Sequence, residues 1–258
     1  MGILETGVGD VATRRVKAVL DRLGYEVRRK PTDEGSRSFP PDFDQAVCEL
    51  YERVRPYTMT SVERVLALRD AVRYVSSAKI PGDICECGVW RGGSMMVVAL
   101  TLLEMGDTSR DLYLFDTFTR PPEPGPKDSP SAGAELADAL KIPELALLPI
   151  EEVRAKLGDT GYPGEKIHLV QGLVEDTVPA RAPENLALLR LDTDYYSSTA
   201  HEMQHLYGRL SPGGILIIDD YGKFIGARTA VDEYFNSTGQ HVLLNRIDET
   251  GRLVVVPG

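Results

Sequence analysis

Short runs of apolar residues recur along the chain after residue 80, and each run ends at a polar or glycine-rich turn. They span residues 84–87, 112–116, 167–171, 186–192 and 215–220. Continuous apolar runs of this length are typical of strands that are buried on both faces of a sheet. The pattern therefore predicts a sheet of buried strands in this part of the chain.

Segments with the apolar spacing of helices lie between these runs, at residues 94–105, 134–140, 150–157, 200–210 and 227–234. Strands that alternate with helices imply right-handed crossovers, and hence a doubly wound, mostly parallel sheet. The end of the chain differs, because residues 241–247 and 252–256 flank Asp248-Glu-Thr-Gly251, a hairpin signal. We expect an α/β fold whose sheet has seven strands and ends in an antiparallel hairpin.

The first 77 residues predict helices rather than strands. Residues 11–23 have helical spacing, and residues 28–41 form a polar, proline-bearing loop. Two helices follow between residues 41 and 77, broken around residues 56–60, with Thr60 or Ser61 as the cap of the second. We therefore divide the chain into an N-terminal helical segment, 1–77, that serves oligomerisation or the substrate pocket, and a sheet domain, 78–258.

Composition narrows the classes of partner. With 258 residues, 42% hydrophobic and 26% charged, the chain is typical of a globular protein. A net charge of −10 with no basic cluster argues against nucleic acid, and no apolar run is long enough to cross a membrane. The three cysteines, Cys48, Cys85 and Cys87, cannot all pair with one another, which favours a reducing, cytoplasmic setting.

Candidate chemistry lies where the predicted strands end, because ligands of parallel sheets bind beyond those ends. The first run continues as Glu86-Cys-Gly-Val-Trp-Arg-Gly-Gly-Ser94, whose glycines allow a tight turn and close approach to a ligand. Asp116 ends the second run, where a carboxylate can accept both hydroxyls of a ribose or can simply cap a helix. The glycine loop lacks the phosphate-binding spacings, so the pair favours a nucleoside cofactor without phosphate, such as S-adenosylmethionine.

Four carboxylates follow two further runs: Asp192, Asp194, Asp219 and Asp220. If these strands are neighbours, like charges converge, which is costly unless a cation intervenes or the pKa values rise. Mg²⁺ is the simplest solution, and acids solvated at a sheet edge are the alternative. A rival motif, His201-Glu202-Met-Gln-His205, has zinc-ligand spacing on a helix and leaves a zinc metallohydrolase open.

Several motifs occur together: Gly88-Val-Trp-Arg-Gly-Gly93, Phe115-Asp-Thr-Phe118, Leu189-Arg-Leu-Asp-Thr-Asp194, and Leu210-Ser-Pro-Gly-Gly214 before Asp219-Asp-Tyr221, with Thr58-Met-Thr60 upstream. In this combination the chain resembles the macrocin O-methyltransferase (TylF-type) family. The resemblance implies a Rossmann-like class I methyltransferase that depends on S-adenosylmethionine and Mg²⁺. It also implies a homo-oligomer that methylates a hydroxyl on a deoxysugar of a glycosylated natural product such as an antibiotic. A catalytically silent protein that keeps only the fold is the remaining alternative.

The resemblance also implies roles for single residues. The methionine end of the cofactor is surrounded by Thr60, Glu86, Gly88, Trp90 and Ser94. Asp116 binds the ribose with Thr117 and Phe118 beside it, and Gly172 and Leu173 border the adenine. Asp192, Asp219 and Asp220 match the metal ligands, and Asp194 matches the general base. The proline-rich segment 119–128 departs from the family pattern and lies where a lid is expected.

Overall fold

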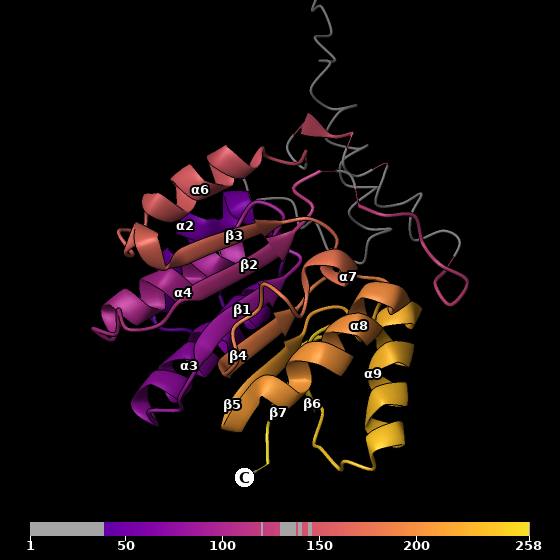
Figure 1. Cartoon of the computed structure of the whole chain (residues 1–258). Helices are drawn as coiled ribbons and strands as arrows, with labels where there is room; N and C mark the ends of the chain where they lie inside the picture. The colour runs from indigo at the N-terminus through magenta and orange to yellow at the C-terminus, as the bar shows by residue number, and fades with distance from the viewer. Residues whose placement is uncertain (1–38, 120, 130–137, 139–140, 144–145, 258) are drawn as a thin grey trace, which may run out of the picture.

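The computed structural model describes residues 39–119, 121–129, 138, 141–143 and 146–257. These residues form a seven-stranded sheet in the order β3-β2-β1-β4-β5-β7-β6 (Figure 1). The strands are β1 (Asp83–Cys87), β2 (Leu112–Asp116), β3 (Ile167–Gln171), β4 (Leu186–Leu191), β5 (Leu210–Ile218), β6 (Asn245–Arg246) and β7 (Arg252–Val255). The first five pair in parallel, whereas β7 runs antiparallel to β5 and β6. The predicted α/β fold is confirmed.

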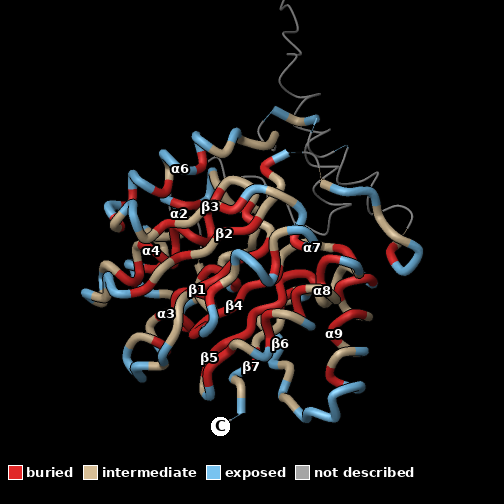
Figure 2. The backbone as a smooth tube through the Cα atoms, in the orientation of Figure 1, coloured by how far each residue is buried: buried red, intermediate tan, exposed pale blue. Residues whose placement is uncertain are grey.

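Helices cover both faces of this sheet, because alternate strand residues point to opposite sides. Ile84 packs in one core with α2 (Gln45–Val54), α3 (Val62–Ser77), α4 (Gly93–Glu104) and α6 (Ile150–Gly158). Its neighbours Cys85 and Cys87 pack in a second core with α7 (Val174–Thr177), α8 (Tyr196–Leu206) and α9 (Ile225–Thr238). The central strands are accordingly the most deeply buried part of the molecule (Figure 2).

The two helices expected between residues 41 and 77 correspond to α2 and α3, with the short 3₁₀ helix η1 (Arg55–Tyr57) between them. Ser61 is the N-cap of α3, since its side chain accepts a hydrogen bond from the backbone N of Arg64 at 3.1 Å. Two further 3₁₀ turns, η3 (Gly164–Lys166) and η4 (Tyr207–Arg209), precede β3 and β5.

Some helix and strand boundaries differ from the expected ones because of contacts with residues that are distant in the sequence. Helix α8 begins at Tyr196 rather than at residue 200, because Asp128 Oδ1 accepts a hydrogen bond from the Tyr196 N at 2.8 Å. Strand β5 extends back to Leu210, which pairs with Leu186 across a register shift. Strand β6 is only two residues long, and Leu243 before it is 81% exposed. Local spacing does not reveal such tertiary partners.

The expected helix at residues 11–23 lies outside the described residues, as does nearly all of that at residues 134–140. Within the described ranges, no helix has both the length and the apolar character that a membrane span requires.

Candidate active site

A cleft opens at the carboxyl ends of the parallel strands and encloses about 1200 Å³, including its mouth. Ligands of parallel sheets bind at this edge, because loops that follow neighbouring strands converge there. Most of the predicted site residues line it: Thr60, Gly88, Trp90, Ser94, Asp116, Thr117, Gly172, Leu173, Asp192, Asp194, Asp219 and Asp220. The predicted cofactor and metal residues therefore share one cavity.

Asp116 holds the glycine loop in shape. Its Oδ2 accepts hydrogen bonds from the backbone N of Val89 at 2.6 Å and of Trp90 at 2.9 Å. Its Oδ1 accepts one from the N of Phe118 at 2.7 Å. The same carboxylate therefore fixes the loops after β1 and β2 while it faces the cleft.

Backbone strain gathers around this cleft. Of the four non-glycine residues with positive φ in the described chain, three belong to the predicted site: Trp90 at 50°, Phe118 at 50° and Asp194 at 66°. This conformation costs an L-residue on the order of 1–3 kcal/mol, and it persists where the surroundings enforce it. Such strain is typical of residues placed for function rather than for stability.

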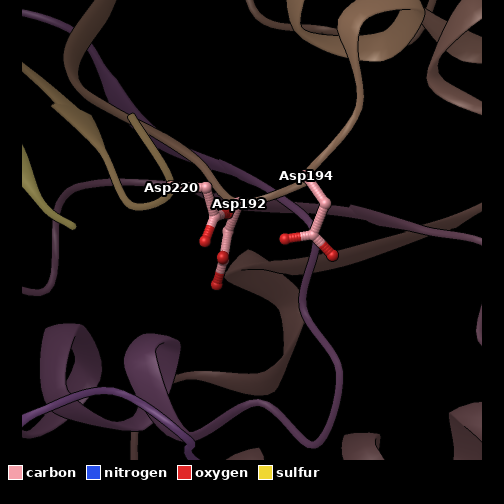
Figure 3. Close-up of side chains that lie close together, drawn as sticks. All are labelled: Asp192, Asp194 and Asp220. Carbon is pink, nitrogen blue, oxygen red and sulfur yellow. The ribbon is translucent and has the colours of Figure 1, made fainter. Parts of the chain in front are cut away.

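Three acids meet at the inner end of the cleft. One carboxylate oxygen from each of Asp192, Asp194 and Asp220 lies within 4.8 Å of those of the other two (Figure 3). Burial raises the pKa of Asp192 and Asp220 well above the usual range and that of Asp194 to about 7; the charge of Arg190 opposes this at Asp192, and neighbouring carboxylates add to it at all three. Asp220 Oδ2 is buried without a hydrogen-bond partner. The group therefore calls for protons or a cation.

Asp219 contacts arginines instead. Its Oδ1 lies 2.5 Å from Arg190 Nη2, and its Oδ2 contacts Arg64 Nη1. The structure thus brings Asp192 and Asp220 together as expected, but the third member of their group is Asp194. The reason is that two buried guanidinium groups hold Asp219, a pairing that spacing along the chain does not reveal.

Arg190 forms ion pairs with three acids: Glu86 on β1, Asp192 directly after β4 and Asp219 directly after β5. Its Nη1 lies 2.7 Å from both Glu86 Oε1 and Asp192 Oδ2. Glu86 is 1% exposed and does not line the cleft. Burial raises its pKa to about 8 although Arg190 works in the opposite direction. Phe118 likewise packs in the core at 6% exposure, so these two of the predicted cofactor residues do not line the cleft.

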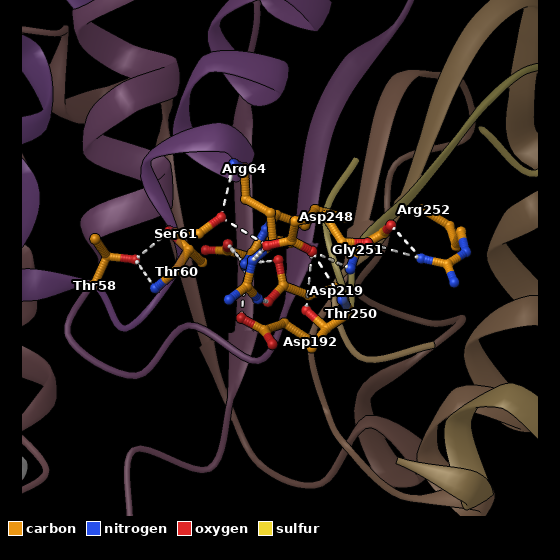
Figure 4. Close-up of polar contacts among 12 residues, drawn as sticks. Thr58, Thr60, Ser61, Arg64, Asp192, Asp219, Asp248, Thr250, Gly251 and Arg252 are labelled. Atoms are coloured by element: carbon orange, nitrogen blue, oxygen red, sulfur yellow. Dashed lines mark hydrogen bonds and ion pairs between the residues drawn. The ribbon is translucent and has the colours of Figure 1, made fainter. Parts of the chain in front are cut away.

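Arg64 and Asp248 join the cleft to the terminal hairpin (Figure 4). Arg64 Nε lies 3.0 Å from Asp248 Oδ2, and the same oxygen accepts a hydrogen bond from Ser61 Oγ at 2.7 Å. Asp248 Oδ1 accepts backbone hydrogen bonds from the turn that it begins, at residues 250 and 251. Because Thr60 beside Ser61 lines the cleft, this network ties the cleft wall to the hairpin.

Sequence reasoning missed the two arginines and part of the cleft wall. The wall residues it missed include Met59, Leu147, Thr193, Ser198, Lys223 and Phe224, whereas Pro121 and Pro122 belong to the segment 119–128 where a lid was expected. Arg190 carried a visible signal, because a cation inside the apolar run 186–192 is costly to bury unless it is paired. Arg64 carried none, since it occupies an ordinary position of a helix.

The zinc-spaced motif has a different environment. His201 Nε2 donates to the carbonyl oxygen of Val178 at 2.9 Å, and the His201 and His205 rings lie tilted at 49° to each other with centroids 4.4 Å apart. Glu202 is fully buried and accepts a hydrogen bond from Thr193 Oγ1. Among the described residues, the only three or more metal-ligating side chains that lie close enough together to hold one ion are the aspartates of Figure 3. The histidines therefore pack α8 against its surroundings.

The chain is similar in sequence to known O-methyltransferases. A family model described as Macrocin-O-methyltransferase (TylF) matches residues 15–254. The chain is 37% identical over 236 residues to the 8-demethyl-8-(2,3-dimethoxy-alpha-L-rhamnosyl)-tetracenomycin-C 4'-O-methyltransferase of Streptomyces olivaceus, covering 92% of this chain and 88% of that one. It is 32% identical over 197 residues to the mycinamicin III 3''-O-methyltransferase of Micromonospora griseorubida, covering 76% of each.

A solved structure extends the comparison to three dimensions. The O-methyltransferase NovP superposes with a TM-score of 0.71 at 25% sequence identity, over 97% of this chain and 99% of that one. A family model that covers most of the chain and relatives above 30% identity lead to the same assignment. The chain is a methyltransferase that belongs to the macrocin-O-methyltransferase (TylF) family.

Proposed function

We propose that the chain transfers the methyl group of S-adenosylmethionine to a sugar hydroxyl of a glycosylated natural product, with Mg²⁺ bound at the aspartates. One observation carries the proposal: a single cleft joins the glycine loop and Asp116 to the acid group of Figure 3. The name of the relative from Streptomyces olivaceus specifies a rhamnosyl compound, which supports a glycoside as substrate.

The cleft suits a nucleoside cofactor. Asp116 presents a carboxylate for a ribose at the end of β2, and Gly88 and Ser94 line the cleft beside the loop that follows β1. Leu173 lines the cleft and is 39% exposed, an apolar surface that suits an adenine ring. S-adenosylmethionine supplies an activated methyl group when bound there.

The acid group suits a hard divalent cation. Carboxylate oxygens are the ligands that Mg²⁺ prefers, and the unpartnered Asp220 Oδ2 points to a partner of positive charge. We assign the ion to Asp192, Asp219 and Asp220, the set that the resemblance implies: two of them belong to the acid group, and each Asp219 oxygen keeps a lone pair beyond its arginine contact. Mg²⁺ would stabilise negative charge on the acceptor oxygen.

Asp194 is proposed as the general base. It lies beyond the end of β4, two residues after Asp192, in a strained turn that lines the cleft. A carboxylate in that position can take the proton of an acceptor hydroxyl as the oxygen attacks. Met59, Pro121, Pro122 and Phe224 add apolar wall, which helps to exclude water and to orient the two reactants.

The test is a methyl-transfer assay with labelled S-adenosylmethionine on a panel of glycosylated natural products, with catechols as the off-class control. We expect transfer to at least one glycoside, loss in excess EDTA and recovery with Mg²⁺. Full activity in EDTA would contradict the metal role, and transfer only to catechols would contradict the substrate class. Tightly bound zinc would favour the hydrolase alternative, and no affinity for S-adenosylhomocysteine would favour a silent protein.

A further inference from the structure

Asp194 sits in the middle of a three-residue turn. The backbone N of Tyr195 donates to the carbonyl oxygen of Thr193 at 2.7 Å, and the φ of Asp194 between them is 66°. A turn closed by an i to i+2 hydrogen bond with positive φ at its centre is rare and strained. Contacts outside the turn must therefore hold Asp194 in place.

One side of the turn is fixed by β1. The N of Asp192 donates to the carbonyl oxygen of Cys87 at 2.8 Å. A Cβ on Gly88 would lie 2.0 Å from the Asp192 carbonyl oxygen, so the two backbones are in close contact. These contacts position Asp192 and the backbone N of Thr193, but they do not reach the Thr193 side chain or Asp194.

The side chain of the first turn residue, Thr193, is held by Glu202 on α8. Thr193 Oγ1 lies 3.0 Å from Glu202 Oε1 and 3.1 Å from Oε2, so one hydroxyl is shared by both oxygens. Glu202 is fully buried, and a buried carboxyl group is costly unless a donor satisfies it. The bond joins the rigid helix directly to the residue whose carbonyl oxygen closes the turn.

We propose that Glu202 is a positioning residue for methyl transfer, which holds Asp194 in place through the hydroxyl of Thr193. The proposal rests on the base role proposed for Asp194. It gives the acid of the His201-Glu202-Met-Gln-His205 motif a function that involves neither zinc nor contact with the reacting atoms.

The experiment compares Thr193→Val, which removes only the hydroxyl, with Thr193→Ser, which keeps it. For Thr193→Val we expect kcat to fall about 10-fold or more while the KM for S-adenosylmethionine changes less than about threefold. S-adenosylhomocysteine and Mn²⁺ binding, measured by calorimetry, should stay near parent values. Thr193→Ser should recover kcat to within about threefold of the parent. Glu202→Gln, which keeps an acceptor oxygen, should behave like Thr193→Ser.

Glu202→Met should behave like Thr193→Val, and the double variant should be no worse than either, because both remove one bond. His205→Gln on the same helix is the matched control and should keep kcat. If Thr193→Val folds and keeps the kcat of Thr193→Ser, the proposal is overturned, whether or not Glu202→Met folds. Equal losses of kcat, cofactor binding and thermal stability would also overturn it, since they indicate a merely structural role.

An Asp194→Ala arm separates the two proposals. If it loses kcat while Thr193→Val does not, the positioning role alone fails. If Asp194→Ala keeps kcat, the base assignment fails and the positioning role fails with it.

Discussion

Arg190 Nη2 lies 2.5 Å from Asp219 Oδ1, and both side chains are 3% exposed. Arg190, a buried cation on β4, thus lies next to the acids that line the cleft. Strand β4 pairs with β5, and Asp219 directly follows β5. The charge of Arg190 offsets the repulsion among carboxylates that the loops at the sheet edge bring together. The acids proposed for metal binding and the structural ion pairs are therefore parts of one network.

Arg190→Met should destabilise the protein strongly. The change leaves the buried acids of Glu86 and Asp219 without this partner, which typically costs about 3–5 kcal/mol of unfolding free energy. Denaturant unfolding measures the loss. Arg55→Met is the matched control, since Arg55 forms an exposed pair with Glu52 and should change the free energy by less than about 1 kcal/mol. Equal small effects of both variants would contradict the role of Arg190.

The acids of the cleft should be separable by calorimetry and kinetics. Asp194→Ala should leave Mg²⁺ and S-adenosylmethionine affinities nearly intact while kcat falls about 100-fold or more, because only the base is lost. Asp192→Ala should weaken binding of Mg²⁺ and of the acceptor, and Asp219→Asn should lower turnover more than cofactor binding. If Asp194→Ala abolishes metal binding while Asp219→Asn keeps it, the ion is held by the group of Figure 3 and the two roles are exchanged.

Gly88→Ala should abolish cofactor binding and lower stability by at least about 2 kcal/mol. The φ of Gly88 is 85°, and its added Cβ would lie 2.0 Å from a backbone oxygen of Asp192. Thermal unfolding and titration with S-adenosylhomocysteine measure the two effects. Gly158→Ala is the control, because no atom lies within 4 Å of its added Cβ and its φ is not positive. A Gly88→Ala protein that binds normally would show that the loop can move away.

Asp248→Asn should destabilise the protein in a pH-dependent way. Burial works to raise the Asp248 pKa, but the charge of Arg64 and hydrogen bonds from Gly251, Ser61 and Thr250 outweigh it and lower the pKa below 3.8. A lowered folded-state pKa means that the stabilisation is fully present above the unfolded value and is lost as pH falls through the folded value. The difference between parent and variant should thus be largest near neutral pH and vanish in acid.

Urea unfolding of parent and variant across this range of pH is the measurement. Glu249→Gln changes the exposed neighbour and should give no pH-dependent difference. A gap between Asp248→Asn and the parent that stays constant down to strongly acidic pH would show that the carboxylate charge is not what stabilises the hairpin turn.

Replacing both His201 and His205 with Gln should leave methyl transfer within about threefold of the parent, because their rings pack on each other and on the backbone near Val178. Metal analysis of the double variant should match that of the parent. Loss of bound metal together with all activity would move the metal site from the aspartates to this helix.

The sheet and the place of the cleft follow from local pattern. Apolar runs such as 112–116 and 167–171 match β2 and β3 residue for residue, although β3 lies at the sheet edge and is only partly buried. Asp116 and Asp192 could be placed at the cleft because the carboxyl ends of parallel strands share one edge. The cap of α3 could be narrowed to Thr60 or Ser61, since capping depends on residues only three apart, and the structure has Ser61.

Tertiary structure alone decided which charges meet. Arg64 reaches Asp219 across 155 positions of the chain and Arg190 reaches Glu86 across 104, so no local period carries these pairings. The start of α8 depends likewise on Asp128, 68 positions before Tyr196. Ion pairs and tertiary caps form where the packed sheet and helices bring side chains together, and burial then removes the water that would screen their charges. The sequence determined where the acids lie along each strand, and packing determined which of them face arginine.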